Sequence, residues 1–219
     1  MKIRECLYNL QLLWENVAPR RCAVCGDKID EGVFCQICRE HFVINKMVEQ
    51  GETINIIYLL YKYEREVRKV IHAVKFENKG RYLYQLEEEA RVIFGSYWQE
   101  LLQQYDLTVA IPTSVNRSQE RGYEVPEEIF DFLNFHQMHK VLERRRVTAP
   151  LFNLNKEQRE QEVAGCFKVI ADVTDKRVLL LDDIYTTGAT ANEAAKTLLA
   201  AGAKYVDVLA FSAGKNNWN

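Results

Sequence analysis

The stretch VLLLDDIYTTGAT, from Val178 to Thr190, decides how this 219-residue sequence is interpreted. Its first four residues form an unbroken apolar run that is typical of a strand buried on both faces. After Gly188, small residues predict a helix over residues 189–201, and a second buried strand follows from Val206 to Phe211. Strand, helix and strand in this order predict a βαβ unit with parallel strands.

Two adjacent carboxylates stand where the first of these strands is predicted to end. Ligands of open α/β sheets collect at the carboxyl ends of strands, and Asp182 and Asp183 occupy such an end. Because like charges repel, the pair is more favourable where a ligand offers hydroxyl donors or a cation. We therefore predict that both aspartates bind a ligand.

Hydroxyl and amide groups follow the carboxylates at the start of the predicted helix. A helix N-terminus favours an anion such as phosphate, and a glycine there lets the anion come close to the backbone N–H groups. A phosphate beside a vicinal diol describes a ribose 5-phosphate. The alternative is that Asp183 and Thr187 only cap the turn and the helix. The predicted phosphate-binding residues are Thr186, Thr187, Gly188, Ala189 and Thr190.

The preceding part of the chain adds further strands and helices. Apolar runs predict strands over residues 54–63 and 107–111. Helical spacing predicts helices over residues 64–76, 82–104 and 125–135, and the second of these is expected to turn at or near Gly95. Residues 144–162 predict a long surface loop with one helical turn near Lys156. Together these elements predict an α/β domain with a mostly parallel sheet over residues 51–219.

Four cysteines lie in two closely spaced pairs, CAVC and CQIC, separated by nine residues. Two such knuckles can direct four thiolates at one point, which is the tetrahedral arrangement that structural zinc prefers. The alternatives are two redox pairs or buried thiols without a metal. With an amphipathic helix predicted from Ile3 to Val17, the zinc site forms a predicted N-terminal module of residues 1–50. The predicted zinc ligands are Cys22, Cys25, Cys35 and Cys38.

Charge and hydropathy exclude several classes of protein. Lys and Arg number 29 and Asp and Glu number 31, so a net charge of −2 argues against binding nucleic acid by bulk charge. No apolar run approaches the ~20 residues that cross a bilayer, and Glu5 and Glu15 interrupt any signal peptide. The cysteine pattern favours a reducing compartment, so we expect a cytoplasmic protein.

One local stretch is nevertheless basic. Between residues 62 and 81, seven basic side chains face three acidic ones, a local charge of +4, and Tyr61, Tyr63 and Phe76 lie among them. Cations beside aromatic faces suit single-stranded nucleic acid, although a basic helix face is also a common solvated surface. The predicted nucleic-acid residues are Arg65, Arg68, Lys69 and Lys75, and Arg144 to Arg146 either add to them or bind phosphate.

These motifs together resemble the ComF/GntX family. The stretch after Leu181 is similar to the 5-phosphoribosyl 1-diphosphate (PRPP) motif of type I phosphoribosyltransferases, in which two acidic residues precede two variable ones, two Thr or Ser and a Gly. The Lys75–Phe76 pair, Pro112 and the Arg-Gly-Tyr of residues 121–123 are similar to other family motifs. Four positions depart from the family pattern: Glu124, Val125, Leu151 and Glu162.

The resemblance implies a phosphoribosyltransferase fold that binds PRPP with Mg²⁺. It implies that Asp182 and Asp183 take the ribose hydroxyls and are the catalytic candidates, and that Thr186 to Thr190 wrap the 5-phosphate. Arg117 and Arg121, in the loop after the 107–111 strand, are candidates for the diphosphate, or else lie on a solvated surface.

The resemblance also implies a role in DNA uptake during natural transformation, with single-stranded DNA and a ComFA-like helicase as partners. The alternative is an active phosphoribosyltransferase that moves ribose 5-phosphate from PRPP to an unidentified nitrogen nucleophile and has no connection with DNA. Whether transfer occurs is left open by the residues themselves, because no motif specifies the acceptor.

Overall fold

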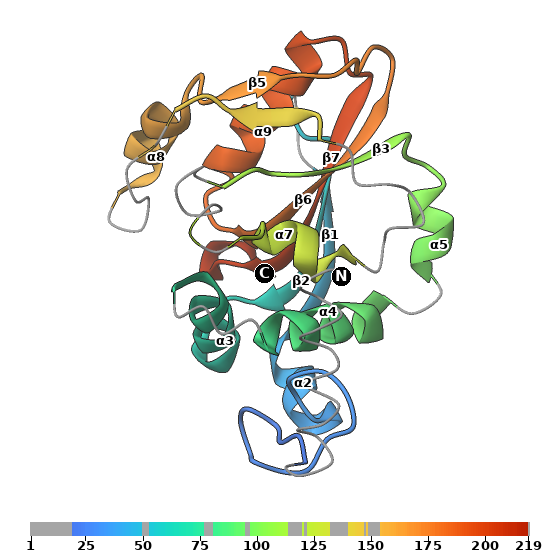
Figure 1. Cartoon of the computed structure of the whole chain (residues 1–219), viewed down its shortest axis with the longest axis vertical. Coiled ribbons are helices and arrows are strands. Elements are labelled where there is room, and N and C mark those ends of the chain that lie inside the picture. The colour runs from blue at the N-terminus through green and yellow to red at the C-terminus, as the bar shows by residue number, and fades with distance from the viewer. Residues whose placement is uncertain are drawn as a thin grey trace.

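The computed structural model describes residues 19–49, 53–76, 81–94, 97–113, 120, 122–131, 140–146, 148 and 154–218 (Figure 1). The predicted helix of residues 3–17 lies outside them. The strands are β1 (Val43–Glu49), β2 (Ile56–Lys62), β3 (Leu107–Ala110), β4 (Leu142–Arg144), β5 (Phe167–Val169), β6 (Arg177–Tyr185) and β7 (Tyr205–Ala213). The α-helices are α2 (Gln36–Phe42), α3 (Arg65–Phe76), α4 (Arg81–Phe94), α5 (Tyr97–Leu102), α7 (Val125–Ile129), α8 (Lys156–Val163) and α9 (Ala189–Ala200), and a short 3₁₀ helix covers Lys215–Asn217.

A five-stranded sheet in the order β1-β2-β7-β6-β3 forms the centre of the molecule. Strands β2, β7, β6 and β3 run parallel, and β1 pairs antiparallel with β2 at one edge. The predicted α/β class with a mostly parallel sheet is therefore confirmed. Strand β1 lies in the predicted N-terminal module of residues 1–50, yet it pairs within this sheet. Strands β4 and β5 form a separate antiparallel pair.

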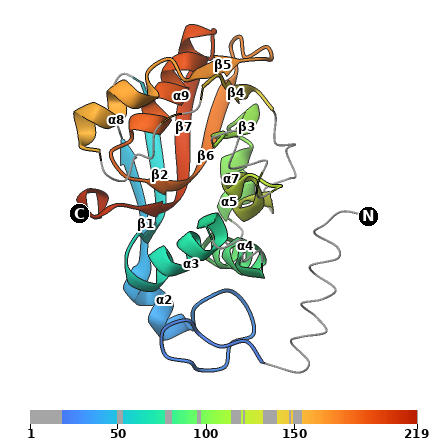
Figure 2. The same cartoon turned by 60° about the vertical axis from the view of Figure 1, so that its left-hand side comes forward.

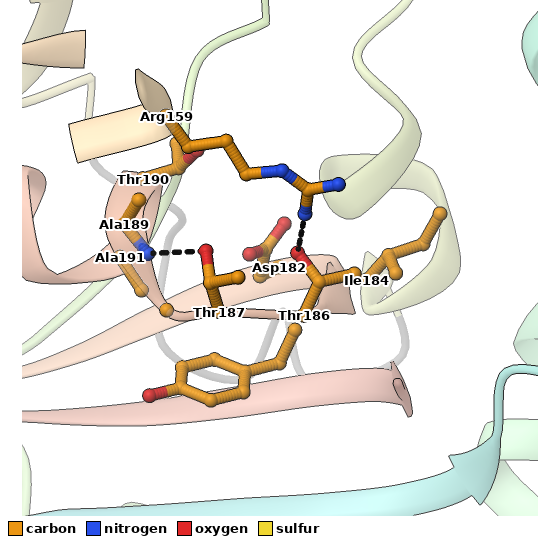
Figure 3. Close-up of a pocket in the computed structure, with 10 residues that line it drawn as sticks. Arg159, Asp182, Ile184, Thr186, Thr187, Ala189, Thr190 and Ala191 are labelled. Carbon is orange, nitrogen blue, oxygen red and sulfur yellow. Dashed lines mark hydrogen bonds between the residues drawn. The ribbon is translucent and has the colours of Figure 1, made fainter. Parts of the chain in front are cut away.

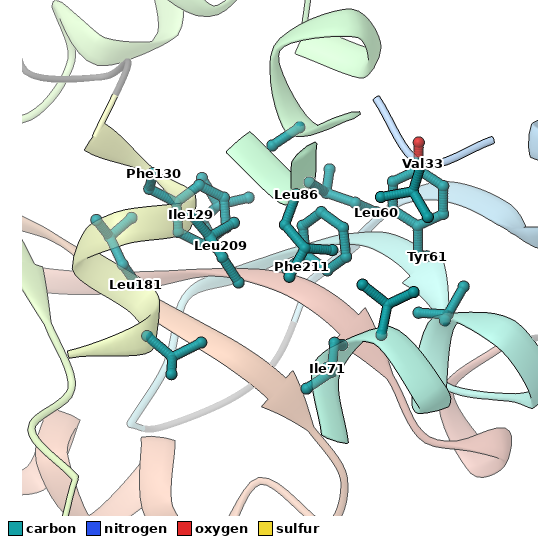
Figure 4. Close-up of a cluster of buried hydrophobic side chains, with 14 of the residues drawn as sticks. Val33, Leu60, Tyr61, Ile71, Leu86, Ile129, Phe130, Leu181, Leu209 and Phe211 are labelled. Carbon is teal, nitrogen blue, oxygen red and sulfur yellow. The ribbon is translucent and has the colours of Figure 1, made fainter. Parts of the chain in front are cut away.

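Apolar side chains of β6 alternate between two cores, one on each face of the sheet. Leu179 and Leu181 pack with α3, α4 and α7, whereas Val178 and Leu180 pack with α9. Figure 4 shows Leu181 within the first of these cores, and Figure 2 shows helices on both faces of the sheet. All four residues are fully buried, as expected for a strand with helices on both faces. This double burial explains why the sequence shows a continuous apolar run rather than an alternating one.

Strand β6 and helix α8 are among the elements that extend beyond the boundaries predicted from the sequence. Strand β6 continues through the acid pair to Tyr185, because β7 offers backbone partners as far as Ala213. Helix α8 has eight residues where one turn was predicted. Asn155 accepts a hydrogen bond from the Gln158 N–H at 2.9 Å and the Gln158 side chain accepts one from the Asn155 N–H at 3.0 Å, a reciprocal cap that begins this polar helix.

Within the described residues, no helix combines the length and the apolar character needed to cross a membrane.

Candidate functional site

The predicted phosphate loop and one of the two aspartates line a common pocket where β6 ends and α9 begins (Figure 3). The pocket has a volume of about 230 Å³, including its open mouth. Asp182 and Ile184 reach it from β6, and Arg159 reaches it from α8. The remaining lining residues are Tyr185, Thr186, Thr187, Gly188, Ala189, Thr190 and Ala191.

Gly188 is required by the shape of this loop. Its φ of +77° lies in the left-handed region, which side chains other than glycine rarely adopt. A Cβ at this position would also lie 2.8 Å from Cζ of Tyr185 and 2.9 Å from Nδ2 of Asn192, so there is no room for a methyl group. The tyrosine ring therefore packs directly against the turn that opens α9.

Capping does not account for this series of residues. Gly188 is the N-cap residue of α9 and, being a glycine, has no side chain that could accept a cap hydrogen bond. Thr187 Oγ1 accepts a long hydrogen bond of 3.4 Å from the Ala189 N–H, and the Asp183 side chain accepts one from Lys75. The alternative that Asp183 and Thr187 serve only as caps thus explains little of the observed geometry.

The last residues of the chain hold the loop in place. Asn217 donates a side-chain hydrogen bond to the Thr186 carbonyl at 2.7 Å, and the Gly214 N–H donates to the Tyr185 carbonyl at 2.8 Å. Trp218 donates from its indole to the Ala213 carbonyl at 2.6 Å, which fixes this segment against the end of β7. The backbone of the loop is therefore restrained before any ligand binds.

Arg159 is a pocket residue that was not predicted as a ligand contact. Its Nη1 donates to Thr186 Oγ1 at 3.0 Å (Figure 3), and its Nε donates to the Leu154 carbonyl at 2.9 Å. Among the described residues that line the pocket, Arg159 is the only basic one. The sequence predicted one helical turn near Lys156 but gave no indication that this turn would carry Arg159 to the phosphate loop.

The structure separates the two aspartates that were predicted to bind ligand together. Asp182 lines the pocket, whereas Asp183 is buried and points to α3, where Lys75 Nζ lies 2.7 Å from its Oδ1. Successive residues of a strand face opposite sides, so adjacent carboxylates cannot both face one pocket on a regular strand. The other oxygen of Asp183, Oδ2, is buried and has no hydrogen-bond partner among the described residues.

The electrostatics of Asp182 differ from those of an exposed aspartate. Burial is the largest influence and the neighbouring Asp183 adds to it, so that the pKa of Asp182 rises to about 7. Lys75 and backbone N–H groups partly oppose this rise. Near neutral pH, the pocket therefore holds a carboxyl group that exchanges its proton readily and accepts hydrogen bonds best above pH 7.

Most of the predicted nucleic-acid residues share one exposed face of α3. Arg65, Arg68 and Lys69 are exposed, and His72 and Phe76 continue the same helical stripe. Phe76 is 55% exposed, and its ring centroid lies 4.7 Å from that of His72. We call these five residues the α3 stripe.

Two residues of the predicted basic and aromatic stretch lie elsewhere. Lys75 points away from the α3 stripe and forms an ion pair with Asp183. Tyr61 is fully buried, stacks on Phe211 with the ring centroids 5.1 Å apart, and donates its hydroxyl to Glu89 at 2.6 Å. The helical and strand periodicities of the folded chain turn Lys75 toward β6 and Tyr61 into the core, and local composition did not reveal this.

The four predicted zinc ligands converge on one point. Their sulfur atoms all lie within 4.8 Å of one another, and the Sγ atoms of Cys25 and Cys35 are 3.7 Å apart. Four sulfurs at ~2.3 Å from a zinc ion in a tetrahedron are about 3.8 Å apart, so the cluster has the size of such a site. Cys22 and Cys38 are buried, and Cys25 is exposed.

Backbone amides also favour a thiolate in this cluster. Burial raises the pKa of Cys22, but N–H groups of Cys25, Cys35 and Val24 outweigh it and bring the pKa to about 7. A thiolate is the form of cysteine that binds metal. The donor set and the spacing therefore fit a metal such as zinc, with no position left for a substrate.

A buried carboxylate joins the cysteine loop to the main sheet. Glu89 of α4 is fully buried, forms an ion pair with Arg39 of α2, and accepts the Val33 N–H at 2.9 Å. A Cβ on Gly32 would collide with this carboxylate, so the loop approaches α4 as closely as glycine allows. The cysteine loop and α2 are thus docked on α4 at the lower end of the molecule in Figure 1.

The loop after β3 is described only in part. The predicted diphosphate residues Arg117 and Arg121 lie outside the described residues. Glu124, one of the departures from the family pattern, accepts hydrogen bonds from Thr113 Oγ1 at 2.6 Å and from the Thr113 N–H at 3.2 Å. The acidic side chain at this position therefore connects the two ends of the loop through Thr113.

Comparison with curated proteins finds relatives named for competence and for DNA utilization. The chain is 36% identical over 136 residues to competence protein ComFC of Streptococcus pneumoniae, a match that covers 61% of this chain and spans only 60% of that protein. It is 22% identical over 209 residues to ComFC of Bacillus subtilis, with 89% of this chain and 78% of the relative covered. It is 22% identical over 204 residues to the DNA utilization protein YhgH of Escherichia coli, with 85% of this chain and 87% of the relative covered.

No family model matches the chain. The relatives nevertheless confirm the predicted resemblance to ComF-type competence proteins.

Proposed function

We propose that this protein binds PRPP in the pocket at the end of β6 and acts in DNA uptake. The observation that carries the proposal is the joint lining of this pocket by the Asp182 carboxylate and the phosphate loop of residues 186–190. In this arrangement the 5-phosphate lies against the loop, with Arg159 beside it, and the Asp182 carboxylate accepts a hydrogen bond from a ribose hydroxyl. Mg²⁺ accompanies the diphosphate of the ligand and neutralises part of its charge.

Asp183 takes an indirect role in this proposal. Because its side chain is paired with Lys75 on the far side of β6, it affects the ligand through the charge that it places beside Asp182. The predicted direct contact between Asp183 and the ribose is therefore replaced by a contact through Asp182 alone.

The role in DNA uptake rests on the relatives, which are named competence proteins and DNA utilization proteins. The α3 stripe supports single-stranded DNA as a ligand, because exposed cations lie beside an exposed aromatic ring. A ComFA-like helicase in the cytoplasm is the protein partner that we propose. The cysteine cluster holds a structural zinc ion that stabilises the loop docked on α4.

Isothermal titration calorimetry with PRPP and MgCl₂ tests the pocket. We expect wild-type protein to bind, and Asp182→Asn to bind about tenfold more weakly or less, because it loses a charged hydrogen-bond acceptor. Asp172→Asn is the matched control, because Asp172 is exposed and remote from the pocket lining. Absence of heat with the wild type, or equal affinity of the Asp182→Asn variant, would overturn the proposal.

Transfer of the ribose is tested separately from binding. If the protein is a phosphoribosyltransferase, PRPP and a nitrogen nucleophile give free diphosphate, which an enzymatic assay detects. A PRPP-binding protein without transferase activity binds in calorimetry and releases no diphosphate above the Asp182→Asn background.

A further inference from the structure

Arg144 carries a positive charge that no described residue neutralises. It is the last residue of β4, is partly buried, and forms no ion pair with a carboxylate in the part of the chain that the structure describes. Its Nη1 donates to the Pro112 carbonyl at 3.3 Å and its Nη2 to Thr148 Oγ1 at 2.8 Å. Nε is buried and has no partner among the described residues.

The packing around Arg144 holds the guanidinium group in a defined position. Phe167 is its cross-strand partner on β5, and the guanidinium carbon lies 5.4 Å from the centre of that ring. Phe167 is buried, so the stacked arginine rests on a rigid part of the core. An arginine held in this way loses little further freedom when an anion binds.

Electrostatics at this position favour an anionic ligand. Burial lowers the pKa of Arg144, an effect that Cys166 and Glu124 oppose and Arg146 reinforces. Glu124 is itself engaged by Thr113, and Arg146 donates to carbonyl groups at the end of α8. A partly buried charge without a counter-ion is costly in a folded protein unless an anion joins it.

The position of Arg144 in the fold places it at the end of β3, the strand that pairs with β6 on the way to the proposed PRPP pocket. Pro112 follows β3, and the N–H of the preceding Ile111 donates to the Leu181 carbonyl at 3.0 Å. Leu181 is the residue immediately before Asp182 on β6. Arg144 therefore flanks the strand ends on the β3 side, whereas Arg159 lies on the Thr186 side.

PRPP carries anionic groups at two ends of its ribose, and the molecule places one arginine at each side of the strand ends. We infer that Arg144 is a binding residue for the diphosphate group, opposite the 5-phosphate that Arg159 and the phosphate loop receive. This inference rests on the proposed PRPP pocket, but its ligand chemistry is distinct: the planar guanidinium group gives two parallel hydrogen bonds to phosphate oxygens.

Calorimetry with three probes tests the assignment: PRPP with MgCl₂, inorganic diphosphate with MgCl₂, and ribose 5-phosphate. We expect Arg144→Gln to weaken the binding of PRPP and of diphosphate by about tenfold or more, because a charged hydrogen bond is lost. The affinity for ribose 5-phosphate stays within about twofold of the wild type. Arg144→Lys should retain part of the diphosphate affinity, since lysine keeps the charge but cannot give two parallel hydrogen bonds.

Lys168→Gln is the matched control, because Lys168 is an exposed cation on the neighbouring strand β5 and its replacement should leave all three affinities unchanged. Equal diphosphate affinity of wild type and Arg144→Gln would overturn the inference, as would an equal loss for all three probes. If the wild type binds ribose 5-phosphate but not diphosphate, the pocket stands and the role of Arg144 fails. If the wild type binds diphosphate through Arg144 but neither sugar phosphate, the PRPP proposal fails instead.

Discussion

The ammonium nitrogen of Lys75 lies 2.7 Å from Oδ1 of Asp183, in an ion pair whose side chains are 19% and 5% exposed. This pair joins the last turn of α3 to β6, on the face of the strand opposite to Asp182. It connects the helix that carries the α3 stripe with the strand that carries Asp182. The pair therefore affects both stability and the charge of the pocket.

Replacing Lys75 by methionine leaves the Asp183 carboxylate buried without its counter-ion. We expect the free energy of unfolding to fall by about 2–4 kcal/mol, since breaking a buried pair is costly. Lys69→Met should change it by less than about 0.5 kcal/mol, because Lys69 is exposed and forms a surface pair. Urea unfolding of both variants measures the difference, and equal stabilities would contradict the predicted importance of the pair.

The raised pKa of Asp182, about 7, predicts a stability that depends on pH. An unfolded aspartate has a pKa of about 3.9, so the folded state binds this proton more tightly. The favourable contribution is complete below about pH 4 and is lost as the pH rises to about 7. Asp182→Asn should therefore gain stability relative to wild type between pH 5 and pH 8, by on the order of 2 kcal/mol.

Urea unfolding at pH 5 and at pH 8 checks this prediction. Asp172→Asn is the control, because the Thr174 N–H lowers the pKa of Asp172 and its titration falls outside this window. A stability difference between wild type and Asp182→Asn that is the same at pH 5 and pH 8 would contradict the prediction.

Gly188→Ala should distort the phosphate loop. The added methyl group meets the Tyr185 ring and Asn192 in addition to the strain of a positive φ. Gly122→Ala separates the two effects, since Gly122 has a φ of +79° but open space around its Cβ position. We expect both variants to lose about 1 kcal/mol from backbone strain, and only Gly188→Ala to lose further stability and PRPP affinity. Thermal melting and calorimetry distinguish them.

The cysteine cluster predicts about one zinc ion per chain, measured by elemental analysis of protein purified without chelator. Cys38→Ser should reduce the zinc content to well below half an equivalent and lower the melting temperature, because metal binding supplies folding free energy. Cys166→Ala removes a cysteine that lies outside the cluster and should retain the metal. Full zinc content in Cys38→Ser would argue against tetrahedral binding by these four residues.

The α3 stripe predicts binding of single-stranded DNA that weakens steeply with salt. Replacing Arg65, Arg68 and Lys69 by glutamate should reduce the affinity for DNA. It should also make the plot of log affinity against log salt concentration less steep. Phe76→Ala should cost about 1–3 kcal/mol of binding through lost base stacking. Fluorescence anisotropy with a labelled oligonucleotide measures these effects, and unchanged affinity in the charge-reversed protein would exclude this face.

Much of the site was predictable because its parts are local in the chain. The phosphate loop is a turn between a strand and a helix, so its chemistry lies within a few consecutive residues, from Thr186 to Thr190. The cysteine knuckles are similar, because two short turns determine where four sulfurs meet. Arg159 was harder to predict, since its contact with Thr186 spans 27 positions and depends on how α8 packs on α9.

The sequence by itself determined the α/β class, the parallel strands, the pocket loop and the cysteine cluster, because periodicity and short motifs encode them directly. Only the tertiary structure decided the direction of individual side chains. The pleat of β6 turns Asp182 toward the pocket and Asp183 toward Lys75, although the two are adjacent in the chain. The packing of α3 and of the β4–β5 pair likewise decided that Lys75 faces Asp183 and that Arg144 lies beside the strand ends without a counter-ion among the described residues.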